Sequence, residues 1–171
     1  MIAYSTQSLT ATRAVQHEKG NGMKVLVRTF NELSNAELYE IMRLRQNVFV
    51  VEQGCSYTDM DGRDVTASHV LLDGNDGLAG CCRVLPPIEN GEPAEIGRFV
   101  VSAPYRRKGF GHRMMEDAVR TCKELYPTLA IRIRAQSHLA AFYGKHGFCP
   151  VGAEYMSEGI PHTDLIRDAE V

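Results

Sequence analysis

The 171-residue chain lacks the sequence features of a membrane-spanning, secreted or nucleic-acid-binding protein. No apolar run approaches the roughly 18–20 residues that cross a bilayer. The N-terminus has no basic segment followed by an apolar one, as a secretory signal would have. A formal net charge of −2 provides no overall field that would attract nucleic acid or an anionic lipid surface. We therefore expect a cytoplasmic protein with no membrane partner and no nucleic-acid partner.

Metal-ligand and redox motifs are also missing. Five cysteines stand at positions 55, 81, 82, 122 and 149, and no two of them form a C-x-x-C motif. The acidic run Asp59–Asp64 does not make a calcium loop, because Asp64 and Val70 stand where an EF-hand loop needs glycine and glutamate. We predict small buried thiols in a reducing compartment, Asp side chains that stabilise loop turns, and no metal site.

The length and periodicity of the chain indicate one α/β domain. Residues 1–22 are polar and have little periodicity, so we predict a flexible N-terminal extension followed by a single domain over 23–171. Apolar alternation predicts strands over 23–30, 68–72, 78–85, 95–102, 129–135, 148–156 and 163–167. Helical spacing predicts helices over 34–51, 110–125 and 137–146, the last capped by Ser137 and ended by Gly147.

A basic, glycine-containing loop separates the strand over 95–102 from the helix that begins at Phe110. The loop contains Arg106-Arg107-Lys108 followed by Gly109 and Gly111. The first N–H groups of a helix have no partner inside the helix and lie at the positive end of its dipole, and glycine lets an anion approach them. This pattern is typical of a phosphate-binding loop, although an ordinary solvated basic turn has the same composition.

The pattern Arg106-x-x-Gly109-x-Gly111 resembles the acyl-CoA pyrophosphate loop of the GNAT N-acetyltransferases. It is neither a Walker A loop nor a dinucleotide fingerprint, because His112 and Met114 stand where those motifs need lysine and a third glycine. Phe142-Tyr143 with Gly147-Phe148 is similar to the second block of the same family. The segments 45–53 and 159–162 are similar to the ElaA-like branch of the GNAT superfamily.

This resemblance implies a mixed central β-sheet with helices on both faces and a splayed strand pair that holds acyl-CoA. The strand backbone would bind the pantetheine arm and the basic loop would bind the pyrophosphate. The implied acyl-CoA-binding residues are Phe99, Val100, Val101, Arg106, Arg107, Lys108, Gly109, Phe110, Gly111, His112 and Gln136. Many relatives carry asparagine at the position of Gln136. Dimers are frequent among similar proteins, so the resemblance leaves a homodimer open.

The resemblance further implies an N-acyltransferase that moves an acetyl group from acetyl-CoA to a primary amine by direct attack in a ternary complex. The alternative is a non-catalytic module that senses acyl-CoA. Tyr143 matches the family tyrosine that protonates the leaving thiolate. An alkylammonium lies roughly 3.4 pKa units from neutrality at pH 7, about 4.6 kcal/mol that a base and a desolvated site must supply.

The candidate general bases are Glu52, His162, Glu95 and His69, and a water chain is a further alternative. We favour Glu52 and His162, because Glu52 follows an amphipathic helix and an imidazole titrates in the useful range. The loops over 52–64 and 157–162 mix acidic residues with Tyr57 and His162. We expect a small-molecule or peptide amine of polar or cationic character as the acceptor.

Overall fold

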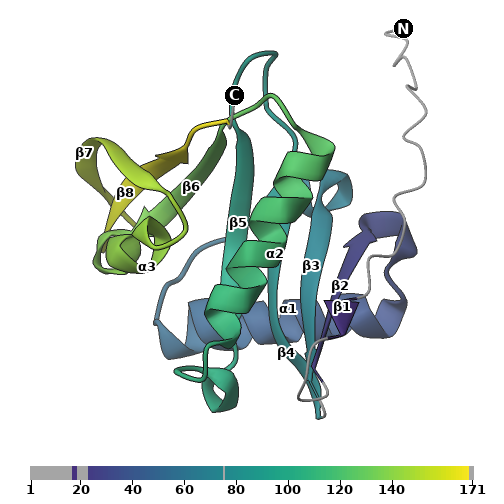
Figure 1. Ribbon diagram of the computed structural model, residues 1–171. Helices are drawn as coiled ribbons and strands as arrows, with labels where there is room; N and C mark the ends of the chain where they lie inside the picture. Colours follow the sequence, from purple (N-terminus) through teal and green to yellow (C-terminus); the bar gives the residue numbers. More distant parts are fainter. Residues whose placement is uncertain (1–16, 19–22, 75, 170–171) are drawn as a thin grey trace, which may run out of the picture.

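The computed structural model describes residues 17–18, 23–74 and 76–169 and contains a mixed sheet with helices on both faces (Figure 1). The strands lie in the order β1 (His17–Glu18), β2 (Lys24–Thr29), β3 (Ser68–Gly74), β4 (Gly77–Leu85), β5 (Ala94–Val101), β6 (Ile131–Gln136), β8 (Ile160–Arg167) and β7 (Cys149–Ser157). Neighbouring strands are antiparallel except for the parallel pair β5 and β6. The predicted fold class is confirmed.

The helices cover the two faces unequally. In Figure 1, α2 (Phe110–Leu125) crosses one face of the sheet and α1 (Asn35–Arg45) lies behind the other. The first helix continues as π-helical turns over Gln46–Glu52, the segment η2, so it reaches the predicted length. A short helix, α3 (Ala140–Gly144), packs beside the C-terminal strands. Short 3₁₀ turns, η1, η3, η4 and η5, cover Phe30–Glu32, Arg63–Thr66, Ala103–Tyr105 and Ser137–Leu139.

Two apolar layers pack against the sheet because side chains alternate along each strand. The larger layer packs Met114, Met115 and Ala118 of α2 against Val70 and the other residues of β3–β6 that face α2. The smaller layer packs Ile41 and Val48 of the first helix against Leu71, Cys81 and Val100 on the opposite face. Four of the five cysteines are buried, as predicted, whereas Cys149 on the edge strand β7 is exposed.

A bulge in β5 produces the predicted splay between β5 and β6. Arg83 pairs with Gly97 and Cys81 pairs with Val100, so Cys82 stands opposite two residues of β5. Arg98, inside this bulge, has a positive φ of 51°. A bulge bends its strand, and the hydrogen-bonded register between β5 and β6 ends after Glu95. The remainder of β5 is therefore separated from β6 by a gap.

One prediction about the start of a helix needs correction. Ser137 does not cap the short helix; it lies inside the first 3₁₀ turn and its Oγ has no hydrogen-bond partner in the described part of the chain. The end of that helix is as predicted, because Gly147 has a φ of 82° and Phe148 N donates to Tyr143 O. In the expected extension over 1–22, His17–Glu18 pair with β2, and the rest lies outside the described residues.

Candidate functional site

The turn before α2 presents backbone N–H groups that have no carbonyl partner within the helix. The first intrahelical bond runs from Arg113 N to Gly109 O at 3.2 Å. The N–H groups of the preceding residues, from Gly109 to His112, therefore point out of the helix N-terminus. Gly109 has a φ of 82°, a left-handed conformation that favours glycine. The predicted basic loop thus has the geometry of an anion site.

The arginine that begins this loop is held by Glu52. Arg106 Nη1 and Nη2 donate to the two carboxylate oxygens of Glu52 at 2.5 and 2.9 Å, and Arg106 Nε donates to Val101 O at 2.7 Å. The hydrogen bond from Arg106 lowers the pKa of Glu52, which favours its charged form. Arg107 and Lys108 are exposed beside the same turn. Glu52 therefore contacts the loop of the expected cofactor site.

The gap between β5 and β6 exposes unpaired backbone groups. Ser102 N donates to Ala79 O at 2.9 Å, so Val100 and Ser102 are the residues that bond to β4. In an antiparallel ladder the residues between them turn their N–H and C=O groups the other way. Val101 therefore directs its N–H group toward the gap, and Phe99 lies in the neighbouring bulge. The side chain of Val100 is buried against α1 and η2.

Consecutive residues at the end of η2 reach both sides of this gap. Glu52 contacts Arg106, which follows β5 in the chain, and Gln53 accepts a hydrogen bond from Gln136 Nε2 at 3.0 Å at the end of β6. Gln136 therefore lies at the gap, with a side-chain partner 83 residues away in the sequence.

A cavity of about 310 Å³ opens at the same place. Its lining comes from the end of η2 and the loop that follows, from β5 and β6, from α3, and from the hairpin of β7 and β8. Phe99 and Gln136 from the two sides of the gap line this cavity together with Tyr143 and His162. Glu52, Glu95 and His69 lie outside its lining. The fold thus joins the gap between the strands to an enclosed polar cavity.

Tyr143 is nearly inaccessible and lies at the apolar end of this cavity. Its ring contacts the rings of Phe99, Phe142 and Phe148 at centroid distances of 6.3, 5.1 and 6.3 Å. Burial raises the pKa of Tyr143 well above its ordinary value of about 10. Its hydroxyl therefore stays protonated at physiological pH and can donate a proton or a hydrogen bond.

His162 lies at the polar end of the cavity, in β8 rather than in the predicted turn. Its Nδ1 lies 2.9 Å from Ile160 O, and the ring stacks on Tyr155 at 6.1 Å. Since a carbonyl can only accept, Nδ1 carries the proton in the neutral ring, and Nε2 is left with a free lone pair. The preceding turn is tight because Glu158 and Gly159 have φ values of 50° and 77°.

The other two candidate bases are engaged elsewhere. Glu95 is buried at the start of β5, where Arg63 holds it at 3.2 Å and Arg134 lies at 3.6 Å. His69 is buried in β3, and its Nε2 lies 3.1 Å from Asp64 O. Burial lowers the pKa of His69, which favours the neutral ring. Neither residue contacts the cavity.

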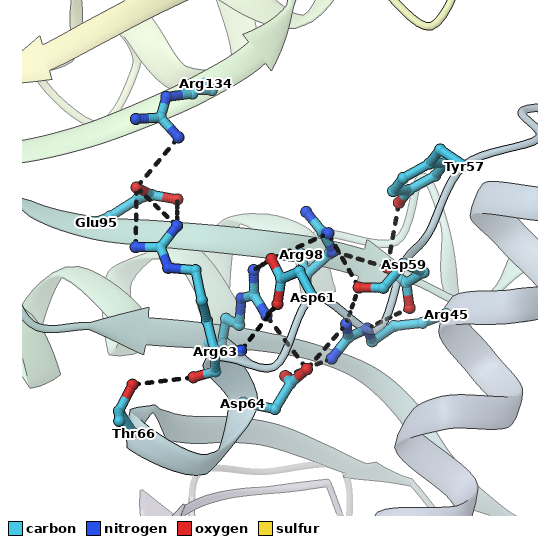
Figure 2. A network of polar contacts seen from close by, with 11 residues as sticks. Arg45, Tyr57, Asp59, Asp61, Arg63, Asp64, Thr66, Glu95, Arg98 and Arg134 are labelled. Carbon is cyan, nitrogen blue, oxygen red and sulfur yellow. Dashed lines mark hydrogen bonds and ion pairs between the residues drawn. The ribbon is translucent and has the colours of Figure 1, made fainter. Parts of the chain in front are cut away.

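A buried network of charges holds the loop between η2 and β3 (Figure 2). Arg45, which is 1% exposed, contacts Asp59 at 2.9 Å and Asp64 at 2.6 Å. Arg83 donates to Asp61 at 2.5 and 2.7 Å, and this hydrogen bonding lowers the pKa of Asp61. One predicted turn bond is present, because Arg63 N donates to Asp61 Oδ1. The main role of the three aspartates is to pair with the buried arginines Arg45 and Arg83.

Sequence reasoning missed several residues that line the cavity. Arg98 of the β5 bulge contacts Asp59 at 2.7 Å and lies over the Tyr57 ring at 5.4 Å. Burial raises the pKa of Tyr57 to about 12. Arg134 extends from β6 toward Glu95. The sequence did contain a signal for Arg98 and Arg134, because each is an arginine inside an otherwise apolar strand.

The expected cofactor residue His112 takes part in an aromatic cluster. Its Nδ1 lies 2.8 Å from His146 Nε2, and its ring lies 4.8 Å from the Phe142 ring. This contact connects the first turn of α2 to the end of α3, which carries Tyr143.

Over residues 17–18, 23–74 and 76–169, no cluster of three or more His, Cys, Asp or Glu side chains could hold a metal ion, and no helix could span a membrane.

A parallel strand pair that opens beside a helix N-terminus and a polar cavity defines the acyl-CoA-dependent acyltransferase class. Residues 55–168 match the acetyltransferase (GNAT) domain family. The chain belongs to this family of acyl-CoA N-acyltransferases. It is similar to protein ElaA from Escherichia coli strain K12, with 40% identity over 140 residues that make up 81% of this chain and 92% of the relative.

Solved structures agree with this assignment. The crystal structure of Escherichia coli ElaA has a TM-score of 0.82 and 37% identity, and the match covers 85% of this chain and 99% of that chain. An acyl-CoA N-acyltransferase from Pseudomonas aeruginosa has a TM-score of 0.80 and 34% identity, with the same coverage of both chains. The resemblance to the ElaA-like branch of the family is confirmed.

Proposed function

We propose that the protein transfers an acetyl group from acetyl-CoA to the primary amine of a small molecule or peptide, by direct attack in a ternary complex. The observation that carries this proposal is the continuity of the gap and the cavity. Phe99 and Gln136 border the gap, and they line the same cavity as Tyr143 and His162. An amine in the cavity would therefore meet a thioester held in the gap.

The cofactor fits the unpaired backbone groups of this site. The N–H groups of Gly109–His112 would bind the diphosphate, with Arg107 and Lys108 adding positive charge beside it. The backbone of Phe99 and the N–H group of Val101 would bind the amides of the pantetheine arm. Arg106 is held by Glu52 and Val101 O, so its role is to fix the conformation of the loop.

In this proposal His162 Nε2 accepts the proton of the substrate ammonium, and the neutral amine then attacks the carbonyl carbon of the thioester. A backbone N–H group of the Phe99–Val101 segment stabilises the oxyanion. As the bond between carbon and sulfur breaks, the Tyr143 hydroxyl donates its proton to the sulfur and is reprotonated from solvent. The second proton of the attacking nitrogen leaves to solvent once the amide has formed.

The direct experiment is thiol release from acetyl-CoA by the full chain across a panel of primary amines. We expect release that depends on the amine, with an acetylated product of matching mass. Calorimetric binding of acetyl-CoA without thiol release with any amine would instead favour the sensor module.

The free thiols of all five cysteines support a reducing compartment, so we propose that the reaction takes place in the cytoplasm.

We expect Glu52→Gln to lower kcat by less than about fivefold, because an exposed ion pair contributes about 0.2–1 kcal/mol. The carboxylate is occupied by Arg106 and lies outside the cavity lining, so Glu52 would be a positioning residue. Any larger change should appear in the KM for acetyl-CoA. A loss of 10²-fold or more in kcat is typical of a removed general base and would indicate that Glu52 is the general base.

We expect His162→Asn to lower kcat by about 10²–10⁴-fold, the usual contribution of a general base. Asparagine keeps a donor near the position of Nδ1, so the bond to Ile160 O and the tight turn are retained. The substitution removes the Nε2 lone pair together with the ring that stacks on Tyr155. Steady-state thiol release measures the effect, and a kcat within a few fold of wild type would show that another group or a water chain accepts the proton.

A further inference from the structure

The polar end of the cavity carries two guanidinium groups. Arg98 projects from the bulge of β5 and Arg134 from β6, and both line the cavity. Glu158 is the only carboxylate among the lining residues, which all belong to the described part of the chain. The acids that pair with the two arginines lie outside the lining: Asp59 and Asp61 pair with Arg98, and Glu95 pairs with Arg134. The cavity wall therefore presents hydrogen-bond donors.

Within the described residues, no acceptor lies within hydrogen-bonding distance of the Arg134 guanidinium. Its contact with Glu95 is 3.6 Å, beyond hydrogen-bonding distance, and its side chain is 44% exposed. Glu95 is already held by Arg63 through contacts of 3.2–3.4 Å. Asp164 stands opposite Arg134 in the ladder of β6 and β8, but it accepts the Tyr155 hydroxyl at 2.8 Å. Arg134 therefore has a fork of N–H groups available to a ligand.

The position of Arg98 also indicates a ligand-binding role for this end of the cavity. Arg98 has a positive φ of 51°, a conformation that costs a non-glycine residue free energy and that clusters at functional sites. Its guanidinium is fixed from one side by Asp59 and from another by the Tyr57 ring. A guanidinium whose rotamer is already fixed loses little entropy when it binds a further group.

Building on the proposed acetyl transfer, we propose that the acceptor carries a carboxylate beside its reactive amine. The carboxylate is bound by the fork of Arg134, with Arg98 adding positive charge, while the amine faces His162. Planar guanidinium groups match carboxylates in a bidentate geometry. The substrate class is therefore an amino acid or a related small aminocarboxylate, and a simple amine without a carboxylate is a poor substrate.

The experiment compares acceptors in matched triplets at saturating acetyl-CoA. Each triplet holds an amino acid, its carboxamide and its decarboxylated amine, all with the same side chain. We expect the amino acid to have a kcat/KM about 10- to 100-fold higher than the other two members, because a site that hydrogen-bonds one substrate group rejects an analogue without that group. Arg134→Gln should bring this ratio close to one.

Arg132→Gln is the matched control, since Arg132 lies on the same strand, contacts Glu92 at 3.4 Å and does not line the cavity. This control should keep the ratio of the wild type. Carboxamides or simple amines that work as well as the amino acids, or a ratio that survives Arg134→Gln, would overturn the carboxylate proposal alone. An absence of thiol release with every acceptor would overturn acetyl transfer and the carboxylate proposal together.

Discussion

Replacing Tyr143 by phenylalanine is expected to lower kcat by about 10²–10⁴-fold while the affinity for acetyl-CoA changes by less than about twofold. The substitution removes one hydroxyl and keeps the ring that packs against Phe99, Phe142 and Phe148. Burial raises the pKa of Tyr143, so the wild-type hydroxyl stays protonated over the whole physiological range. Its loss leaves the departing thiolate without an acid.

Steady-state thiol release gives kcat for this variant, and calorimetric titration with acetyl-CoA gives the affinity. Tyr126→Phe provides the control, because Tyr126 follows the C-terminal end of α2 and packs against the same apolar layer away from the cavity. The control should have the kcat of the wild type. An unchanged kcat in Tyr143→Phe would remove Tyr143 from the mechanism.

Replacing Arg45 by methionine is expected to lower the free energy of unfolding by about 3–5 kcal/mol. Methionine fills a similar space, but it leaves Asp59 and Asp64 buried, at 9% and 8% side-chain exposure, without their shared partner. Burial alone would raise the pKa of Asp64, but the hydrogen bond from Arg45 and the positive charges of Arg45 and Arg83 together outweigh burial, so the pKa is lowered. The substitution therefore leaves carboxylates that are expensive to keep charged.

Urea denaturation measures this loss as a lower midpoint. Arg43→Met is the matched control, since Arg43 lies on the same helix and pairs with Glu40 at the surface, with side-chain exposures of 56% and 37%. An exposed helical pair contributes only about 0.3–0.5 kcal/mol. A cost below about 1 kcal/mol for Arg45→Met would mean that the buried network does not hold the loop.

The sequence was sufficient to predict the local features of the fold and of the basic turn before α2. Apolar alternation predicted the strands around the gap, and the pattern from Arg106 to Gly111 predicted the turn before α2. Each of these features depends on residues that are neighbours in the chain. Gly109 and Gly147 were informative because both adopt a positive φ.

The contacts that decide individual roles could not be predicted in this way, because their partners are far apart in the sequence. Glu52 and Arg106 are 54 residues apart, and Arg98 and Asp59 are 39 residues apart. A position after a helix does not reveal whether a carboxylate faces the acceptor or the cofactor loop. Arg45 is buried on its helix, and its partners Asp59 and Asp64 are set by the path of the following loop.

A crystal structure of the full chain with bound coenzyme A tests most directly whether the diphosphate lies at the start of α2. We predict that its oxygens accept hydrogen bonds from the N–H groups of Gly109–His112. The pantetheine amides should bond to Phe99 and Val101 in the gap between β5 and β6, with the sulfur near Tyr143. Coenzyme A bound at any other place, or no binding at saturating concentration, would contradict the assignment of the site.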